Sequence, residues 1–385
     1  MNTTAGISRL RLRLMKILDA TLGFWLCWIL GYFHYLRNAP ASTPPDSMPK
    51  RILIIRPGGM GDMILLIPVL KYLAGRFPAA QMDIVCEKRN IDILRLAGFE
   101  NNAVAYDAGM LRVFSMLRSR KYDVAIDTEQ FHNSSAIITF LSRAALRIGF
   151  KINPHRNLLY THLVNYNLDG YEGTQFARLL TPLGIDDFSY NLEGCLSVGE
   201  TSMTHGLKEK LDNLTKTGKL VTIHPGSTSI YKQWDIRKFS KLVHRLTTDR
   251  ALQILLIGGN NDIQQANEIL KETGNSGKII SLTGQLTLQE TAEIIHKSRF
   301  FISGDSGLAH LAIAVGTPTI VIFGPTDPEK WGLRNSRHKI VRKPLACSPC
   351  FIFGYHKLCH SIDCMANISP EEVFAACDAL LKQEA

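Results

Sequence analysis

Short apolar runs alternate with amphipathic stretches along nearly the whole chain after residue 50. Short runs rich in Ile, Val, Leu and Ala predict buried strands, and apolar residues at helical spacing predict the helices between them. In this first block, strands are expected at 51–55, 82–86, 102–106 and 122–127, and helices at 63–77, 109–120 and 135–146. Such alternation is typical of a parallel, doubly wound α/β sheet.

The alternation weakens between about 150 and 215, where only a helix near 172–183 is expected, and then restarts. In the second block, strands are expected from 219 and at 251–259, 278–284, 300–307 and 318–326, with helices at 235–249, 261–273, 287–298 and 307–316. The 385 residues suffice for two domains. We therefore expect two Rossmann-like domains, 51–215 and 216–385, facing each other across a cleft.

Residues 1–50 have a different character, because a basic start is followed by an apolar, aromatic run. The uncharged run 20–36 is at the lower limit for a membrane span. On a helical projection, one face holds Leu14, Leu18, Leu22, Trp25, Ile29, Phe33 and Leu36, whereas Lys16, Asp19, Gly23, Cys27 and His34 lie mostly elsewhere.

These features predict that residues 8–37 form a helix that attaches to a membrane, lying in the interface at least as readily as spanning it. Arg9, Arg11, Arg13 and Lys16 would meet anionic headgroups. Two alternatives stay open: a signal peptide, which Ala-Pro-Ala at 39–41 would imitate, and a helix packed in a protein groove. Residues 38–50 are expected to be an extended linker.

The formal net charge of +10 favours an anionic partner, such as a phosphorylated substrate or an anionic membrane. The sequence has no basic stripe interleaved with aromatic residues, so a nucleic-acid partner is not expected.

The stretch "RPGGMGD" at 56–62 joins the first expected strand to the first expected helix. Gly58, Gly59 and Gly61 would allow a sharp turn and close approach to a ligand. Asp62 has two readings that are compatible: a helix cap, or a carboxylate at the mouth of a cleft. The turn lacks the full dinucleotide fingerprint and the Walker lysine, which disfavours a nicotinamide dehydrogenase and a P-loop kinase.

Three loops of the second domain follow strands and should meet at one edge of its sheet, where ligands bind in such folds. Successive N–H groups of Asp305, Ser306, Gly307 and Leu308 are expected to converge on a phosphate. The other candidate binding residues are Ser227, Thr228, Lys232, His310 and Thr326. The alternatives are that Asp305 and Ser306 are ordinary helix caps and His310 is a satisfied surface residue. Lys232 would then be a surface lysine on a solvated loop, and Thr326 would belong to a simple turn.

Cys347, Cys350, Cys359 and Cys364 fall within eighteen residues and suit either a structural zinc site or free thiols, with free thiols favoured. His356 and His360 would be spare ligands. The cluster lies outside the candidate loops, so a metal there would be structural rather than catalytic.

Four segments, "RPGGMGDMILLIPVL", "HPGSTSIYKQWD", "SGDSGLAHLAIAVGTPTIVIFGPTDP" and "CSPCFIFGYHKLCHSIDCMANISPEEV", occur in order over about 51–375. Together they resemble the ADP-heptose:lipopolysaccharide heptosyltransferases of glycosyltransferase family 9. The resemblance implies a GT-B architecture and metal-independent, inverting transfer of heptose to the lipopolysaccharide inner core. It also implies that Asp62 is the general base and that Lys232 contacts the donor phosphates, with Asp305, Ser306, Gly307 and His310 around the heptose and diphosphate.

The sequence departs from the family where Thr128–Asn133 replace a common Gln-Gly pair, which leaves the acceptor open. The extra N-terminal helix is also unusual for the family. We expect a nucleotide-diphosphate sugar donor, a lipid-linked oligosaccharide acceptor, no catalytic cofactor, and a location at the cytoplasmic face of the inner membrane. The alternatives are a family 9 enzyme with another nucleotide sugar or another surface-glycan or protein acceptor, and a non-catalytic nucleotide- or carbohydrate-binding module.

Overall fold

A computed structural model describes residues 17–36, 48–199, 205–216, 218–274, 277–353, 355–356, 359 and 361–383. Its contacts divide the chain into two compact units: unit 1 is Met1–Leu168 with Gly173–Tyr190, and unit 2 is Asp169–Glu172 with Asn191–Ala385. The main change of unit falls at residues 190 and 191, whereas the sequence placed the domain boundary at 215. The basic residues 9–16 and most of the expected linker lie outside the described residues.

Unit 1 contains one six-stranded sheet in the order β3-β2-β1-β4-β5-β6, in which all neighbours are parallel. The strands are β1 (Arg51–Arg56), β2 (Gln81–Cys86), β3 (Ala103–Ala105), β4 (Val124–Asp127), β5 (Leu146–Lys151) and β6 (His162–Asn165). The helices are α3 (Met60–Arg76), α4 (Ile91–Leu96), α5 (Met110–Ser119), α6 (Asn133–Leu141), α7 (Pro154–Asn157) and α8 (Glu172–Arg178). Side chains of α5 and α6 pack on β1, β2 and β4 to form a core on one face of this sheet.

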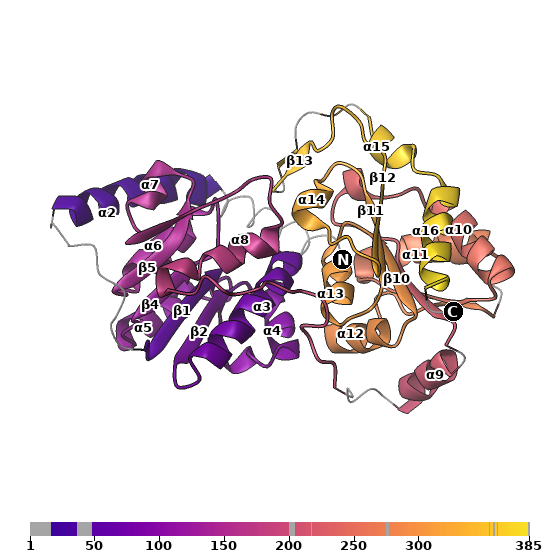
Figure 1. Cartoon of the computed structure of the whole chain (residues 1–385), viewed down its shortest axis with the longest axis horizontal. Helices are drawn as coiled ribbons and strands as arrows, with labels where there is room; N and C mark the ends of the chain where they lie inside the picture. The colour runs from indigo at the N-terminus through magenta and orange to yellow at the C-terminus, as the bar shows by residue number, and fades with distance from the viewer. Residues whose placement is uncertain are drawn as a thin grey trace. The chain divides into compact units, whose positions relative to one another are not determined.

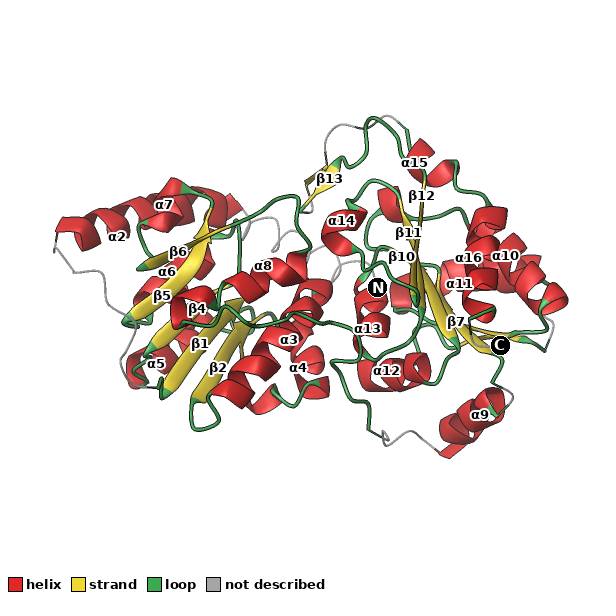
Figure 2. Cartoon of the chain, viewed as in Figure 1, coloured by secondary structure: helices red, strands yellow, loops and turns green. Residues whose placement is uncertain are grey.

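Unit 2 contains a second six-stranded parallel sheet in the order β12-β11-β10-β7-β8-β9 (Figures 1 and 2). Its strands are β7 (Leu220–His224), β8 (Gln253–Leu256), β9 (Ile279–Ser281), β10 (Phe300–Gly304), β11 (Thr319–Phe323) and β12 (His338–Arg342). The helices are α9 (His205–Thr215), α10 (Ile236–Asp249), α11 (Ile263–Glu272), α12 (Leu288–His296), α13 (Gly307–Ala314), α14 (Pro328–Trp331), α15 (Asp363–Ala366) and α16 (Pro370–Leu381). A small antiparallel pair joins β13 (Phe351–Ile352) and β14 (Tyr355–His356).

The two doubly wound sheets expected from the sequence are confirmed, but three strands were missed. The helix expected over 135–146 ends at Leu141, and Leu146 already begins β5. Arg143, with φ of 56°, makes the turn between them. Strands β6 and β12 lie at sheet edges and contain polar residues, so their hydrophobic patterns are weak.

The N-terminal helix is present as a π-helical turn, η1 (Asp19–Gly23), that continues into α2 (Phe24–Leu36). Helix α2 packs on α6 and α7, beside which it lies in Figure 1. In the described part of the chain, no helix combines the length and the apolar character needed to cross a membrane.

Candidate active site

The glycine turn after β1 places Asp62 beside Arg56 in unit 1. Helix α3 begins at Met60 with Gly59 as its N-cap, and the Asp62 carboxylate accepts a hydrogen bond from the Gly59 N–H at 3.2 Å. Its other oxygen lies 3.0 Å from the Arg56 guanidinium. The side chain of Asp62 is 25% exposed, whereas that of Arg56 is only 3% exposed. Asp62 is therefore a cap whose carboxylate still reaches solvent.

Gly58 is the position in this turn where glycine is required by the backbone. Its φ is 124°, a conformation that side-chain-bearing residues rarely adopt, and an added Cβ would lie 3.4 Å from the Arg56 guanidinium. The Gly58 N–H donates to Glu87, and its carbonyl accepts from the Asn90 amide. These bonds fix the turn that orients Asp62. The third glycine, Gly61, lies in the first turn of α3.

Arg56 joins the glycine turn to the loop after β4, because Ile55 of β1 pairs with Asp127 of β4. Its guanidinium donates to the Thr128 carbonyl at 2.7 Å and lies 3.9 Å from the Glu129 carboxylate. Burial alone would raise the pKa of Glu129, but a hydrogen bond with His132 and the charge of Arg56 outweigh it and lower that pKa to about 2. Two carboxylates, Asp62 and Glu129, thus share one buried cation.

A second buried cation, Arg156 of α7, holds the base of the same loop. Its guanidinium donates to Asp127 at 3.1 Å, to the Glu129 carbonyl at 2.7 Å and to the Tyr160 hydroxyl at 3.0 Å. The Tyr160 hydroxyl also donates to Asp127 at 2.6 Å. Arg156 and Asp127 are 1% and 0% exposed at their side chains. Sequence reasoning missed this cluster, because its members come from β4, the loop after it, α7 and the loop after α7, and only the fold brings them together.

In unit 2, Lys232 and Asp305 form an ion pair at the edge of the sheet. The Lys232 ammonium lies 2.7 Å from the Asp305 carboxylate, and the side chains are 18% and 8% exposed. Burial alone would raise the pKa of Asp305, but Lys232 and smaller effects of His310 and Thr326 lower it. The alternative of Lys232 as a solvated surface lysine is wrong. The structure brings Lys232, Asp305, His310 and Thr326 together, as expected for loops that follow the strands of one parallel sheet.

A chain of polar contacts that sequence reasoning missed runs beside this pair. His224, the last residue of β7, lies 3.4 Å from the Ser306 hydroxyl through Nδ1 and 3.3 Å from Asp262 through Nε2. A Cβ added at Gly226 would lie only 1.9 Å from the Asp262 carboxylate, so this loop needs glycine to admit Asp262. The sequence signal that could have indicated His224 was its place in the expected strand that begins at 219, just before Pro225 and Gly226.

The first turn of α13 differs from expectation in one respect. The Asp305 N–H donates to the Ile322 carbonyl of β11, so it cannot join a phosphate cradle, and this expectation was wrong. Ser306 is the N-cap and makes no side-chain cap bond. Gly307 begins the helix, and His310 is buried in its first turn.

The remaining candidates lie in loops at the same edge of the sheet. The Ser227 hydroxyl accepts from the Ser229 N–H at 3.3 Å, so it shapes its own loop. Thr228 lies in this loop, between β7 and the short 3₁₀ turn Ile230–Lys232. Thr326 is buried after β11.

The four cysteines of the sequence cluster lie in unit 2 and form no disulfide. Burial, together with Cys359 and Cys347, raises the pKa of Cys350, and burial with Cys350 raises that of Cys364. Among the described residues, no group of three or more His, Cys, Asp or Glu side chains is arranged to hold a metal ion. The side chains of His356 and His360 lie outside the described part. A structural zinc site here stays a prediction, which elemental analysis of the purified protein tests.

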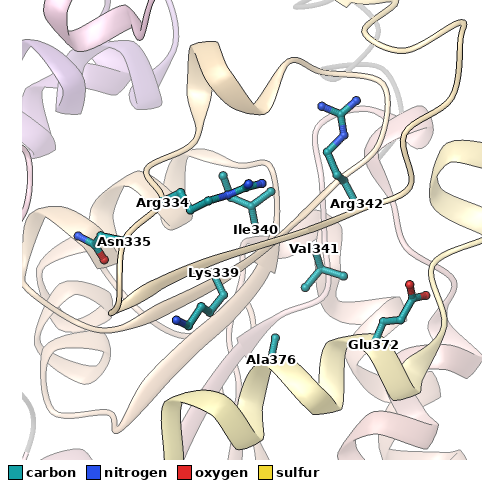
Figure 3. Close-up of a pocket in the computed structure, with 8 residues that line it drawn as sticks. All are labelled: Arg334, Asn335, Lys339, Ile340, Val341, Arg342, Glu372 and Ala376. Atoms are coloured by element: carbon teal, nitrogen blue, oxygen red, sulfur yellow. The ribbon is translucent and has the colours of Figure 1, made fainter. Parts of the chain in front are cut away.

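A surface groove between β12 and α16 contains none of the predicted site residues. Figure 3 shows Lys339 and Val341 of β12 on the side of Glu372 and Ala376 of α16, whereas Ile340 and Arg342 of the same strand point away from α16. Arg334 and Asn335 complete its lining. The groove is basic, but it carries no buried polar group aimed at a ligand, so the loops at the strand ends remain the candidate site.

Comparison with known proteins decides the family. A profile of glycosyltransferase family 9 (heptosyltransferase) matches residues 110–357. The chain belongs to glycosyltransferase family 9. Membership indicates a glycosyltransferase enzyme, so the alternative of a non-catalytic binding module is set aside.

Relatives in the family cover most of the chain. Lipopolysaccharide heptosyltransferase 3 of Escherichia coli K12 is 29% identical over 353 residues, which cover 84% of this chain and 96% of that protein. The solved structure of E. coli ADP-heptose lps heptosyltransferase II has a TM-score of 0.65 at 21% identity, covering 87% of this chain and 100% of that chain. A glycosyltransferase family 9 protein from Veillonella parvula has a TM-score of 0.69 at 16% identity, covering 89% and 100%. These likenesses confirm the α/β fold with two Rossmann-like units that is called GT-B.

Proposed function

We propose that this enzyme transfers a heptose from ADP-heptose to the inner core of lipopolysaccharide, with inversion at the anomeric carbon. The similarity to lipopolysaccharide heptosyltransferase 3 along 84% of the chain carries the proposal. A nucleotide-diphosphate donor also agrees with the net charge of +10. The acceptor is a lipid-linked oligosaccharide, so the enzyme works at the cytoplasmic face of the inner membrane.

In this proposal Asp62 is the general base. An acceptor hydroxyl attacks the anomeric carbon on the face opposite the diphosphate, and its proton passes to the Asp62 carboxylate as the new C–O bond forms. The bond to the diphosphate oxygen breaks at the same time, and ADP leaves with the electron pair. The partly exposed carboxylate of Asp62 is available for this step, and the Arg56 guanidinium, 3.0 Å away, holds it in place.

Lys232 and the N-terminus of α13 are proposed to bind the departing diphosphate. The Lys232 ammonium contacts Asp305, and a phosphate oxygen would offer it a second anionic partner. Backbone N–H groups at the start of α13, after Ser306, add donors and the positive end of the helix dipole. These fixed positive groups can stabilise the developing charge, so we propose that catalysis needs no metal ion.

Lys232→Ala should weaken ADP binding, because it removes one charge-assisted contact with a phosphate. Such contacts contribute about 1.5–3 kcal/mol, which corresponds to roughly 10–150-fold in the dissociation constant. Calorimetric titration of ADP into wild type and variant measures the change. Lys241→Ala, an exposed lysine on α10 of the same unit, is the matched control and should bind ADP as wild type does. If both variants kept wild-type affinity, Lys232 would not contact the diphosphate.

A panel of nucleotide sugars tests the choice of donor. ADP-heptose should bind more tightly than UDP- or GDP-linked sugars, and it alone should support transfer to a truncated inner-core acceptor. Thr128–Asn133 depart from the family pattern, which favours testing other acceptors as well. Transfer from another nucleotide sugar, or to a protein or a different surface glycan, would instead support the alternative of a family 9 enzyme with another donor or acceptor.

A further inference from the structure

The N-terminal helical segment, residues 17–36, packs on the rest of unit 1 through its small residues. Gly23, Cys27 and Gly31 follow one another at four-residue spacing, and all three are buried. A Cβ added at Gly23 would lie 2.8 Å from Asn133 Cβ, and one added at Gly31 would lie 2.5 Å from Leu158 Cβ. The helix therefore approaches α6 and the end of α7 as closely as its backbone allows.

Polar contacts fix the start of the segment at the same place. The Asp19 carboxylate accepts hydrogen bonds from the N–H groups of Asn133 and Ser134, at 2.9 and 2.7 Å, and so caps the N-terminus of α6. The Asn133 amide donates to the Asp19 carbonyl at 2.9 Å. The Phe24 ring lies 4.6 Å from the ring of His155. The segment is thus part of the folded surface of unit 1.

The opposite side of the segment consists of large apolar side chains that the described residues of unit 1 leave exposed. Trp25 is 64% exposed, Tyr32 and Phe33 are each 59% exposed, and no Lys, Arg, Asp or Glu occurs between residues 20 and 36. Half of the large apolar residues that are exposed in the described chain lie in residues 17–36. They are Ile17, Leu18, Leu22, Trp25, Leu26, Trp28, Ile29, Tyr32, Phe33 and Leu36. We call these ten residues the outward face.

This arrangement reverses that of an ordinary surface helix. A helix on a soluble protein buries its large apolar residues and exposes small or polar ones, because burial of apolar area is the main gain. Here the small residues face the protein and the large residues face outward. Such an exposed apolar patch marks an interaction site. Because one side of the helix is occupied by unit 1, only the outward face is open to a partner.

The chemistry of the outward face and its flank fits a lipid surface. Trp25, Trp28 and Tyr32 combine an apolar ring with a polar atom, and such side chains concentrate at the boundary between acyl chains and headgroups. Four basic residues, Arg9, Arg11, Arg13 and Lys16, precede the segment in the sequence and complement anionic headgroups.

We propose that the outward face inserts flat into the interfacial layer of an anionic membrane while Gly23, Cys27 and Gly31 hold unit 1 against the same helix. Unit 1 is then fixed to the lipid surface by a rigid contact rather than by a flexible tether. This deepens the proposed function, on which it rests for the identity of the lipid-linked acceptor. The loop after β4, residues 128–132, leads directly into α6, on which the helix packs. We propose that this loop contributes to acceptor binding, so that it would lie close to the membrane.

Vesicle binding by the full-length protein tests the proposal without any substrate. Wild type should bind vesicles of phosphatidylglycerol and phosphatidylethanolamine more strongly than vesicles of phosphatidylcholine. Trp25→Glu/Ile29→Glu places two charges in the outward face and should lower the partition coefficient at least about tenfold. The matched control is Leu111→Glu/Phe114→Glu on α5, which alters two exposed apolar residues of the same unit and should leave binding unchanged. Thermal melting should show that both variants stay folded, because all four positions are exposed.

A second readout locates the contact. Lipids brominated on the acyl chains should quench Trp25 and Trp28, two of the four tryptophans, whereas Trp234 is buried and cannot meet the bromines. Trp25→Phe/Trp28→Phe should abolish the quenching and keep the binding. Equal vesicle binding by wild type and Trp25→Glu/Ile29→Glu would overturn the proposal. Failure of the wild-type protein to bind vesicles would also overturn it. In that case, light scattering that shows a wild-type dimer which Trp25→Glu/Ile29→Glu loses would mean that the outward face binds a second copy of the chain. Transfer to a delipidated acceptor should be unaffected by the variant, so a failed anchor and a failed function are distinguishable.

Discussion

Asp62→Asn should lower turnover by about 10²–10⁴-fold, the usual contribution of a general base, and leave ADP affinity unchanged. The amide is nearly isosteric with the carboxylate, so its oxygen can still accept the Gly59 N–H and preserve the start of α3. In the proposed mechanism, the variant lacks the group that would take the acceptor proton as the C–O bond forms. Steady-state assays should show the loss in kcat with little change in KM for the donor.

Asp92→Asn is the matched control for this variant. Asp92 is also a carboxylate in the first turn of a helix of unit 1 and also contacts an arginine, Arg95, but it is half exposed. It should turn over at the wild-type rate. Near-normal turnover of Asp62→Asn would remove Asp62 from the chemical step and leave it as a helix cap only.

Arg156→Met should destabilise the protein by about 3–5 kcal/mol, because it leaves the buried Asp127 carboxylate without its cation. The Arg156 guanidinium also donates to the Glu129 carbonyl and the Tyr160 hydroxyl, so the loop after β4 would lose its support. Urea unfolding, followed by a spectroscopic signal from unit 1, measures the change in the free energy of unfolding.

Arg95→Met gives the comparison, since Arg95 pairs with Asp92 on the surface. Exposed pairs contribute about 0–1 kcal/mol, so this variant should unfold close to wild type. The double variant Asp127→Asn/Arg156→Met should recover part of the loss, because no lone buried charge remains. A single variant Arg156→Met with wild-type stability would mean that Asp127 is protonated or solvated in the folded protein.

The fold could be predicted where hydrophobic pattern and position in the sheet agree. Strands β1, β7, β10 and β11 are apolar and central, and each was expected close to its observed bounds. Strand β12 at the edge has only two apolar residues, Ile340 and Val341, and β5 contains Arg147 and Lys151, so their hydrophobic patterns do not stand out. Edge strands and strands that bury an arginine depend on tertiary contacts that sequence patterns do not carry.

The candidate site could be predicted only in part, for the same reason. Strand ends and glycine turns indicated Asp62, Lys232 and Asp305, because such positions meet at one edge of a parallel sheet. The pairing of Lys232 with Asp305 was not foreseen. Nor was the use of the Asp305 N–H by β11, which depends on the register between two strands.

Transfer from ADP-heptose to purified truncated lipopolysaccharide core, followed by NMR of the product in the presence of EDTA, tests the central claim most directly. We predict one heptose added per acceptor, an anomeric configuration opposite to that of the donor, release of ADP, and a rate that EDTA does not change. Retention of configuration, loss of the reaction in EDTA, or transfer only from a different nucleotide sugar would contradict the account.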